Sequence, residues 1–161
     1  MSALDLSELD QLQANYVHAL DTKNMQQWLS LFCSDPDASY ICTTRENVKK
    51  ELPLALMLDD CHARIEDRVT FVTKIWAGTF QDYQTRHLTQ RLLAKRLEDG
   101  TIRINSGFAV YYTADESGSS AILATGEYED LVKFENGEPR FLSKKVILDT
   151  SVLPRYLVYP L

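Results

Sequence analysis

The sequence predicts a segregated α+β fold, in which N-terminal helices pack on a curved antiparallel sheet. Apolar residues recur at helical spacing near the start of the 161-residue chain, and from Thr85 onward the pattern changes to long strand-like runs joined by turn signals. Helices followed by hairpin-linked strands are typical of a fold that keeps its helices on one side of the sheet. Strands of this length favour a sheet that curves strongly around the helices.

Three helices are expected in the first half of the chain. Ser7 is a good N-cap for the first, Asn24 for a second and shorter one, and Asp59 or Asp60 for a third that ends near Gly78. Each helix has an apolar stripe at helical spacing. The stripes are Leu9, Leu12, Tyr16, Ala19 and Leu20; Met25, Trp28, Leu29 and Phe32; and Ile65, Val69, Val72 and Trp76.

The strands are expected at 38–43 and in two hairpins, 85–97 with 101–113 and 120–134 with 140–149. The turns contain Asp99-Gly100 and Asn136-Gly137, which are strong hairpin signals. Strict alternation in the third long strand places one set of residues on one face. These are Ile122, Ala124, Gly126, Tyr128, Asp130, Val132 and Phe134, with Ala121, Leu123 and Leu131 on the other face. The tail, 152–161, is mostly apolar, and its prolines exclude it from a central strand.

Composition and charge exclude several classes of function. With 17 Lys and Arg against 23 Asp and Glu, the net charge is −6 and no basic cluster is present, which argues against nucleic acid and membrane partners. The N-terminus has no signal-peptide pattern and the apolar runs are too short to span a bilayer, so we expect a cytoplasmic protein. Cys33, Cys42 and Cys61 do not imply a disulfide framework.

The histidines and cysteines give only weak signals for a metal. His62 and Glu66 share a helix face and, with His87, could supply two imidazoles and a carboxylate, a set that suits non-haem iron(II). The sequence has no H-E-x-x-H, no C-x-x-C, and no C-x-H followed by C-x-x-H of the kind that binds a Rieske cluster. Nucleophile and phosphate-binding motifs are also missing. We therefore expect no catalytic residue, cofactor or metal in this chain.

An acid–base enzyme is the main alternative. Tyr16, Asp21, Tyr40 and His87 could project into one cavity and exchange protons, as in a stand-alone dehydratase or isomerase. Equally, Tyr16 could be a core aromatic residue and Asp21 could simply end the first helix. A small-molecule binding module without an enzyme partner is a further alternative.

Several segments together resemble a known family. Tyr16, Leu20-Asp21, Trp28 and Leu31-Phe32 are spaced as in the cone-shaped nuclear-transport-factor-like, or cystatin-like, folds. More specific matches run in order along the chain from about residue 8 to residue 161, and they resemble the β (small) subunit of Rieske-type aromatic-ring-hydroxylating dioxygenases. The similarity is greatest to members that act on carboxylated aromatics such as salicylate, anthranilate, halobenzoate or terephthalate. The matching segments are 45–47, 52–56, 65–69, 86–87, 126–128, 146–149 and 160–161.

The resemblance implies a cone of N-terminal helices on a curved antiparallel or mixed sheet, formed by residues 1–161 as one domain. It also implies a division of labour. In this family the α (large) subunit carries the [2Fe-2S] Rieske cluster, the mononuclear iron and the substrate pocket, and receives electrons from a reductase or ferredoxin. The β subunit carries none of these and supports an assembly that is usually α3β3, so this chain would be a structural, non-catalytic subunit in the degradation of aromatic compounds.

Two groups of residues are candidates for the subunit interface. Asp67, Arg68, Arg86 and His87 carry over from the resemblance as structural or interface positions. The tail contributes a second group, because aromatic residues and Arg are enriched at interfaces. That group comprises Arg155, Tyr156, Leu157 and Tyr159. Two alternatives stay open: the tail could cover its own core, and each Arg could form an ion pair within the chain rather than across subunits.

Overall fold

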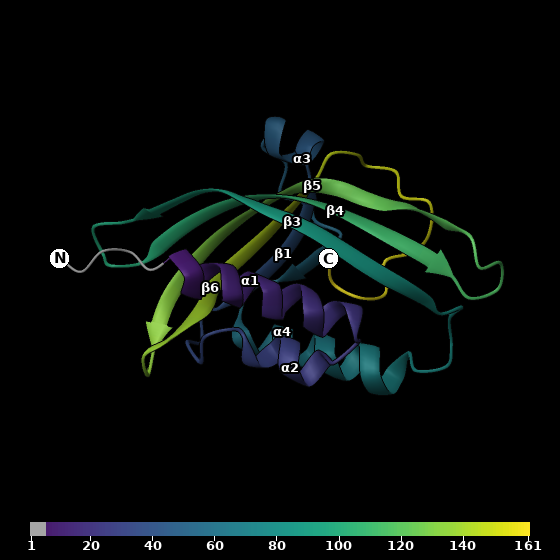
Figure 1. The fold of residues 1–161 in the computed structure, drawn as a ribbon, viewed down its shortest axis with the longest axis horizontal. Coiled ribbons are helices and arrows are strands. Elements are labelled where there is room, and N and C mark those ends of the chain that lie inside the picture. Colours follow the sequence, from purple (N-terminus) through teal and green to yellow (C-terminus); the bar gives the residue numbers. More distant parts are fainter. Residues whose placement is uncertain (1–5) are drawn as a thin grey trace.

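The computed structural model describes residues 6–161 and consists of helices packed against one six-stranded sheet. In Figure 1 the sheet forms an arch, and α1, α2 and α4 lie together beneath it. The helical segments are α1 (Leu6–Asp21), α2 (Met25–Ser30), α3 (Arg45–Lys49), α4 (His62–Thr70) and the π-helical turn η1 (Phe71–Ile75). None of the helices in this part of the chain is long and apolar enough to cross a membrane.

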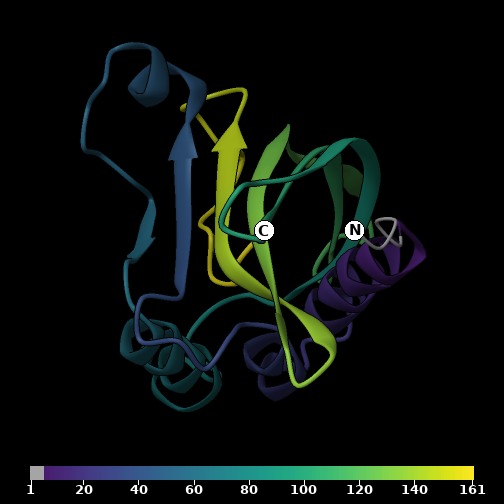
Figure 2. The ribbon, with the colours of Figure 1, turned by 90° about the vertical axis from the view of Figure 1, so that its left-hand side faces the viewer.

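The sheet is mixed, with strand order β2-β1-β6-β5-β4-β3. Only β1 and β6 pair in parallel; the other neighbours are antiparallel. Seen from the side in Figure 2, the strands curve round from β1 to β3, and α1 packs along the β3 edge. The strands are β1 (Ser39–Thr44), β2 (Met57–Asp59), β3 (Tyr83–Arg96), β4 (Ile102–Ala114), β5 (Ser120–Glu135) and β6 (Glu138–Leu148). The expected α+β cone with a curved antiparallel or mixed sheet is confirmed, and the parallel pair β1–β6 makes the sheet mixed.

Two of the expected helix starts are wrong. α1 already includes Leu6, so Ser7 lies within the first turn and is not the N-cap. α4 begins after Cys61, whose side chain makes no capping hydrogen bond. Neither expected cap is used: Asp59 belongs to β2, and Asp60 pairs with Arg64. The expected cap of α2 is confirmed, since the Asn24 side chain accepts a hydrogen bond from the backbone N–H of Gln27 at 3.1 Å.

The long hairpins form where the turn signals placed them. Asn136 and Gly137 both have positive φ, 54° and 83°, as a two-residue turn of type I′ requires. One detail of the alternation is wrong. Leu123 is the extra residue of a β-bulge opposite Val110 and Tyr111, and this reverses the phase of β5 at its start. Leu123 is therefore buried, whereas Ile122 is 53% exposed on the outer face.

Aromatic side chains and the end of the chain fill the inside of the arch. Tyr16 and Tyr40 are fully buried there, and both bond to Leu161. The Tyr16 hydroxyl donates to the backbone oxygen of Leu161 at 2.7 Å, and the Leu161 N–H donates to the Tyr40 hydroxyl oxygen at 2.9 Å. Trp28, Tyr128 and Phe141 complete a cluster of tilted and edge-to-face ring contacts. The final residues of the tail are thus part of the core.

Candidate functional site

A buried pair, Asp21 and His87, joins the end of α1 to β3. The distance between His87 Nδ1 and Asp21 Oδ1 is 2.6 Å, and the backbone N–H of His87 donates to Asp21 Oδ2 at 3.0 Å. The Thr85 hydroxyl donates to the same carboxylate at 2.9 Å. Burial raises the pKa of Asp21, but the bonds and charge of His87 and the bond from Thr85 outweigh this effect and hold that pKa below its ordinary value.

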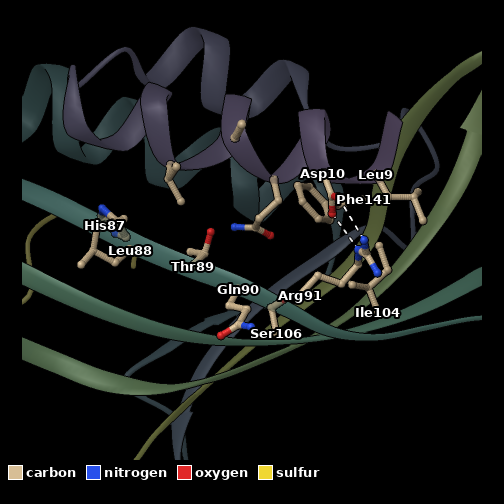
Figure 3. A pocket seen from close by; sticks show the side chains of 13 residues that line it. Leu9, Asp10, His87, Leu88, Thr89, Gln90, Arg91, Ile104, Ser106 and Phe141 are labelled. Carbon is tan, nitrogen blue, oxygen red and sulfur yellow. Dashed lines mark hydrogen bonds and ion pairs between the residues drawn. The ribbon is translucent and has the colours of Figure 1, made fainter. Parts of the chain in front are cut away.

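His87 also lines a groove of about 580 Å³ between α1 and the strands β3 and β4. In Figure 3 His87 lies at one end of this groove, and Asp10 and Arg91 lie at the other. The Arg91 guanidinium donates to both carboxylate oxygens of Asp10, at 2.6 and 3.0 Å, and this bidentate bond lowers the pKa of Asp10. We call this feature the α1–β3 groove.

The four residues of the acid–base alternative are split into two places. Asp21 and His87 meet beside the α1–β3 groove, whereas Tyr16 and Tyr40 are held by Leu161 in the core and do not line that groove. Burial raises the pKa of both tyrosines well above the ordinary value, so neither hydroxyl is poised to exchange a proton near neutral pH. Asp21 and His87 therefore form a pair, but the four residues do not line one common cavity.

A buried ion pair between Lys144 and Asp130 was missed by the sequence analysis. Lys144 Nζ lies 2.9 Å from Asp130 Oδ2 and 3.1 Å from the side-chain oxygen of Gln13. The same ammonium lies 4.0–4.4 Å from the centres of three aromatic rings, those of Tyr16, Tyr128 and Phe141. Burial lowers the pKa of Lys144 and raises that of Asp130. The available signal was a charged residue on the inward face of each of two paired strands.

The weak metal candidates do not come together. His62 faces Glu66 along α4 at 3.6 Å, and His87 is bonded to Asp21 on the other side of the fold. Across residues 6–161, no group of three or more His, Cys, Asp or Glu side chains is arranged to hold a metal ion. The cysteines are free, and burial raises the pKa of Cys33 to about 11 and of Cys42 to about 12. These thiols are therefore protonated near neutral pH.

The first group of interface candidates has mixed exposure. Arg68 forms two hydrogen bonds to Asp59 at the sheet edge, one of them at 2.8 Å between Nη2 and Oδ1. Its partner is therefore Asp59 and not the neighbouring Asp67. Asp67 and Arg86 are exposed on the surface, and His87 is buried against Asp21.

The second group, in the tail, mostly packs on the chain itself. The Arg155 guanidinium lies 4.1 Å from the centre of the Tyr83 ring and donates to the carbonyl oxygen of Gln81 at 2.7 Å. Leu157 and Tyr159 are partly buried against the core. Tyr156 differs, because 92% of it is exposed. The alternative that the tail covers its own core is therefore correct for most of its length.

A family model and a related protein of known name both point to one family. The model of the ring hydroxylating β subunit family matches residues 16–155. The small subunit of anthranilate 1,2-dioxygenase from Burkholderia cepacia is 29% identical over 154 residues, which cover 96% of this chain and 92% of that protein. The resemblance inferred from the sequence is confirmed.

Solved structures confirm the fold. The β subunit of a putative aromatic-ring-hydroxylating dioxygenase from Novosphingobium aromaticivorans superposes with a TM-score of 0.78 at 30% identity, covering 89% of this chain and 88% of that one. A cystatin-like protein of unknown function from Nostoc punctiforme superposes with a TM-score of 0.65 at 17% identity, covering 96% and 97%. The second match shows the fold alone.

Proposed function

The chain belongs to the family of ring-hydroxylating β subunits, and from this membership we propose that it is the structural, non-catalytic small subunit of an aromatic-ring-hydroxylating dioxygenase. Its role in the proposal is to support assembly of the α subunit in the degradation of aromatic compounds. The anthranilate relative suggests a carboxylated aromatic as the substrate of the whole enzyme. All residues of the chain, 1–161, act here as one domain.

The observation that carries the proposal is an apolar strip along the chain before and within β2. Leu52, Leu54, Leu56 and Leu58 are all exposed, Leu54 by 58%, and they follow one another at every second position. The strip ends in β2, an edge strand. A lone small domain rarely leaves so many large apolar side chains in water, whereas permanent subunit interfaces are rich in them. We call this feature the leucine strip.

The cofactors of the reaction are assigned to the partner. Because no donor group in the described part of this chain is arranged to hold a metal, the proposal places the [2Fe-2S] Rieske cluster and the mononuclear iron in the α subunit. Electrons from a reductase or ferredoxin would then reach α. The proposed assembly is α3β3.

The interface candidates fall into two sets, those exposed to another subunit and those engaged within the chain. Tyr156, Asp67 and Arg86 are exposed and would contact another subunit directly. The side chains of the remaining candidates already bond to or pack against other parts of this chain. Their role would be to stabilise the conformation of the contact surface. These candidates are Arg68, His87, Arg155, Leu157 and Tyr159.

Co-expression with a large subunit encoded in the same genome tests the proposal. We expect the two chains to co-elute in size-exclusion chromatography, at a mass that fits equal numbers of both. A chain that stays separate from every such large subunit would contradict the assignment.

A further inference from the structure

The α1–β3 groove has properties that the role in assembly does not use. It runs between helix α1 and the strands β3 and β4, and Thr89 lies between its two ends in Figure 3. Its volume of about 580 Å³ falls within the range of small-molecule sites. Three polar side chains that line it have buried atoms without a hydrogen-bond partner among residues 6–161: His87, Gln13 and Ser106.

The first of these atoms is Nε2 of His87. The carboxylate of Asp21 can only accept hydrogen bonds, so the ring nitrogen that faces it, Nδ1, carries the proton. In the neutral ring Nε2 is therefore an acceptor. The His87 side chain is only 1% exposed, and a buried acceptor without a donor is costly. The pair with Asp21 fixes the orientation of the ring and leaves this buried acceptor, in a residue that lines one end of the groove, without a partner in the described chain.

Gln13 and Ser106 add hydrogen-bond donors. The ammonium of Lys144 can only donate, so it fixes the side-chain oxygen of Gln13 toward the core. The amide nitrogen of Gln13 then has two N–H groups without a partner in the described chain. The Ser106 hydroxyl, on β4, is buried and without a partner in the same way. A ligand in the groove would need an atom that accepts from these donors and a hydroxyl that donates to His87.

The spacing separates these groups along the groove. Ser106 of β4 pairs with Arg91 of β3, and Arg91 is four residues further along β3 than His87. Four residues of a strand span about 13 Å, so His87 and Ser106 belong to opposite ends of a ligand. Apolar side chains also line the groove and suit a ring. They include Leu9, Ala14, Val17, Ile104 and Phe141.

The charges around the groove favour a neutral ligand. Arg91 is bonded to Asp10, Asp21 to His87, and Lys144 beneath the groove to Asp130. Each charged side chain therefore already has a partner in the chain. An ionic ligand would lose its hydration without finding a free opposite charge.

We propose that the α1–β3 groove binds a small uncharged ring compound that carries hydroxyl groups at opposite ends. One hydroxyl donates to Nε2 of His87, and the other group accepts from Gln13 and Ser106. This binding site goes beyond the role in assembly and does not depend on it.

Calorimetric titration of the full chain with 4-hydroxybenzyl alcohol, which is neutral and has two opposed hydroxyls, tests the proposal. We expect saturable binding with one site per chain, weaker binding of benzyl alcohol, and weaker binding of the charged 4-hydroxybenzoate. Ser106→Ala removes one contact and His87→Asn removes Nε2 while keeping a donor to Asp21. Each should lower the affinity by about three- to tenfold, the usual effect of one hydrogen bond.

Ser143→Ala is the matched control, because Ser143 lies on β6 outside the groove and its loss should leave the affinity unchanged. If His87→Asn does not fold, Ser106→Ala still decides the question. The proposal is overturned if none of the three compounds binds at millimolar concentration, which would mean that the groove holds water only. It is also overturned if Ser106→Ala binds as well as the unaltered chain, or if 4-hydroxybenzoate binds best.

Discussion

The hydroxyl of Tyr16 in α1 donates a 2.7 Å hydrogen bond to the backbone oxygen of Leu161, 145 residues further along the chain. This contact joins the first helix to the last residue inside the core. Leu161 is 1% exposed, so the end of the tail is core structure, and only residues further back, such as Tyr156, are available to another subunit. Deleting the whole tail would therefore disturb the monomer as well as any interface.

Tyr16→Phe removes this hydrogen bond and keeps the ring. We expect the free energy of unfolding to fall by about 1 kcal/mol, because the Tyr40 hydroxyl still bonds to Leu161. Urea unfolding followed by circular dichroism measures the change. Tyr156→Phe is the control, since that side chain is exposed and its variant should unfold at the same urea concentration. Equal effects of both substitutions would contradict the stabilising role of the hydrogen bond between Tyr16 and Leu161.

Lys144→Met removes one partner of the buried ion pair and leaves Asp130 in the core. We expect a loss of about 3–5 kcal/mol in the free energy of unfolding, because breaking such a pair strands the other charge. Replacing both residues, Lys144→Met with Asp130→Leu, should recover much of the loss. Thermal unfolding of the three proteins tests this. A double variant no more stable than the single one would argue against the stranded charge as the cause.

Gly126→Ala should destabilise the sheet. A Cβ at this position would lie 2.0 Å from the backbone oxygen of Ile147 on β6, so the two strands would have to move apart. Overpacking of this kind costs about 1–3 kcal/mol, and backbone atoms yield less than side chains. Gly107→Ala on β4 is the matched control, because nothing lies within 4 Å of its added Cβ. The midpoint of urea unfolding should fall for Gly126→Ala and stay nearly constant for Gly107→Ala.

Asp21→Asn should change how stability depends on pH. The folded protein holds the pKa of Asp21 below its ordinary value of 3.8 because of His87 and Thr85, despite the opposing effect of burial. The folded state therefore binds fewer protons at this site, and the stability it contributes is present above pH 3.8 and is lost as the pH falls through the folded pKa. The difference in unfolding free energy between the two proteins should thus shrink in acid. If the difference in unfolding free energy grew as the pH fell, the lowered pKa of Asp21 would be contradicted.

Leu54→Ser in the leucine strip tests the proposed interface. The exposed side chain contributes little to the monomer, so the melting temperature of the isolated chain should change little. Burial of a leucine at an interface is worth about 1.5–3 kcal/mol, so assembly with the large subunit should weaken by at least tenfold. Glu116→Ser, at an exposed turn, is the control and should assemble normally. If Leu54→Ser also assembles normally, the strip is not the contact surface.

Local signals in the sequence were enough for much of this fold. The Asn136-Gly137 turn was predictable because both residues must adopt positive φ, a property of these residue types themselves. The bulge at Leu123 was not, because it depends on the register with β4 rather than on β5 alone. The cap expected from Asp59 failed for a similar reason: a partner nine residues away, Arg68, binds that carboxylate.

The site was harder to predict than the fold. Asp21 and His87 were named as candidates, but their separation from Tyr16 and Tyr40 depends on where the tail ends in three dimensions. No periodic pattern encodes such a contact. The ion pair of Lys144 and Asp130 was different, because the two residues face each other across the predicted hairpin and the signal for their pairing was present but not used.

Iron content and turnover of the separated and recombined subunits test the central claim most directly. The account predicts that the purified chain contains no stoichiometric iron and converts no aromatic substrate, that iron accompanies the large subunit, and that adding this chain restores the assembled, active enzyme. Tightly bound iron in this chain, or turnover of an aromatic compound by this chain in isolation, would contradict it.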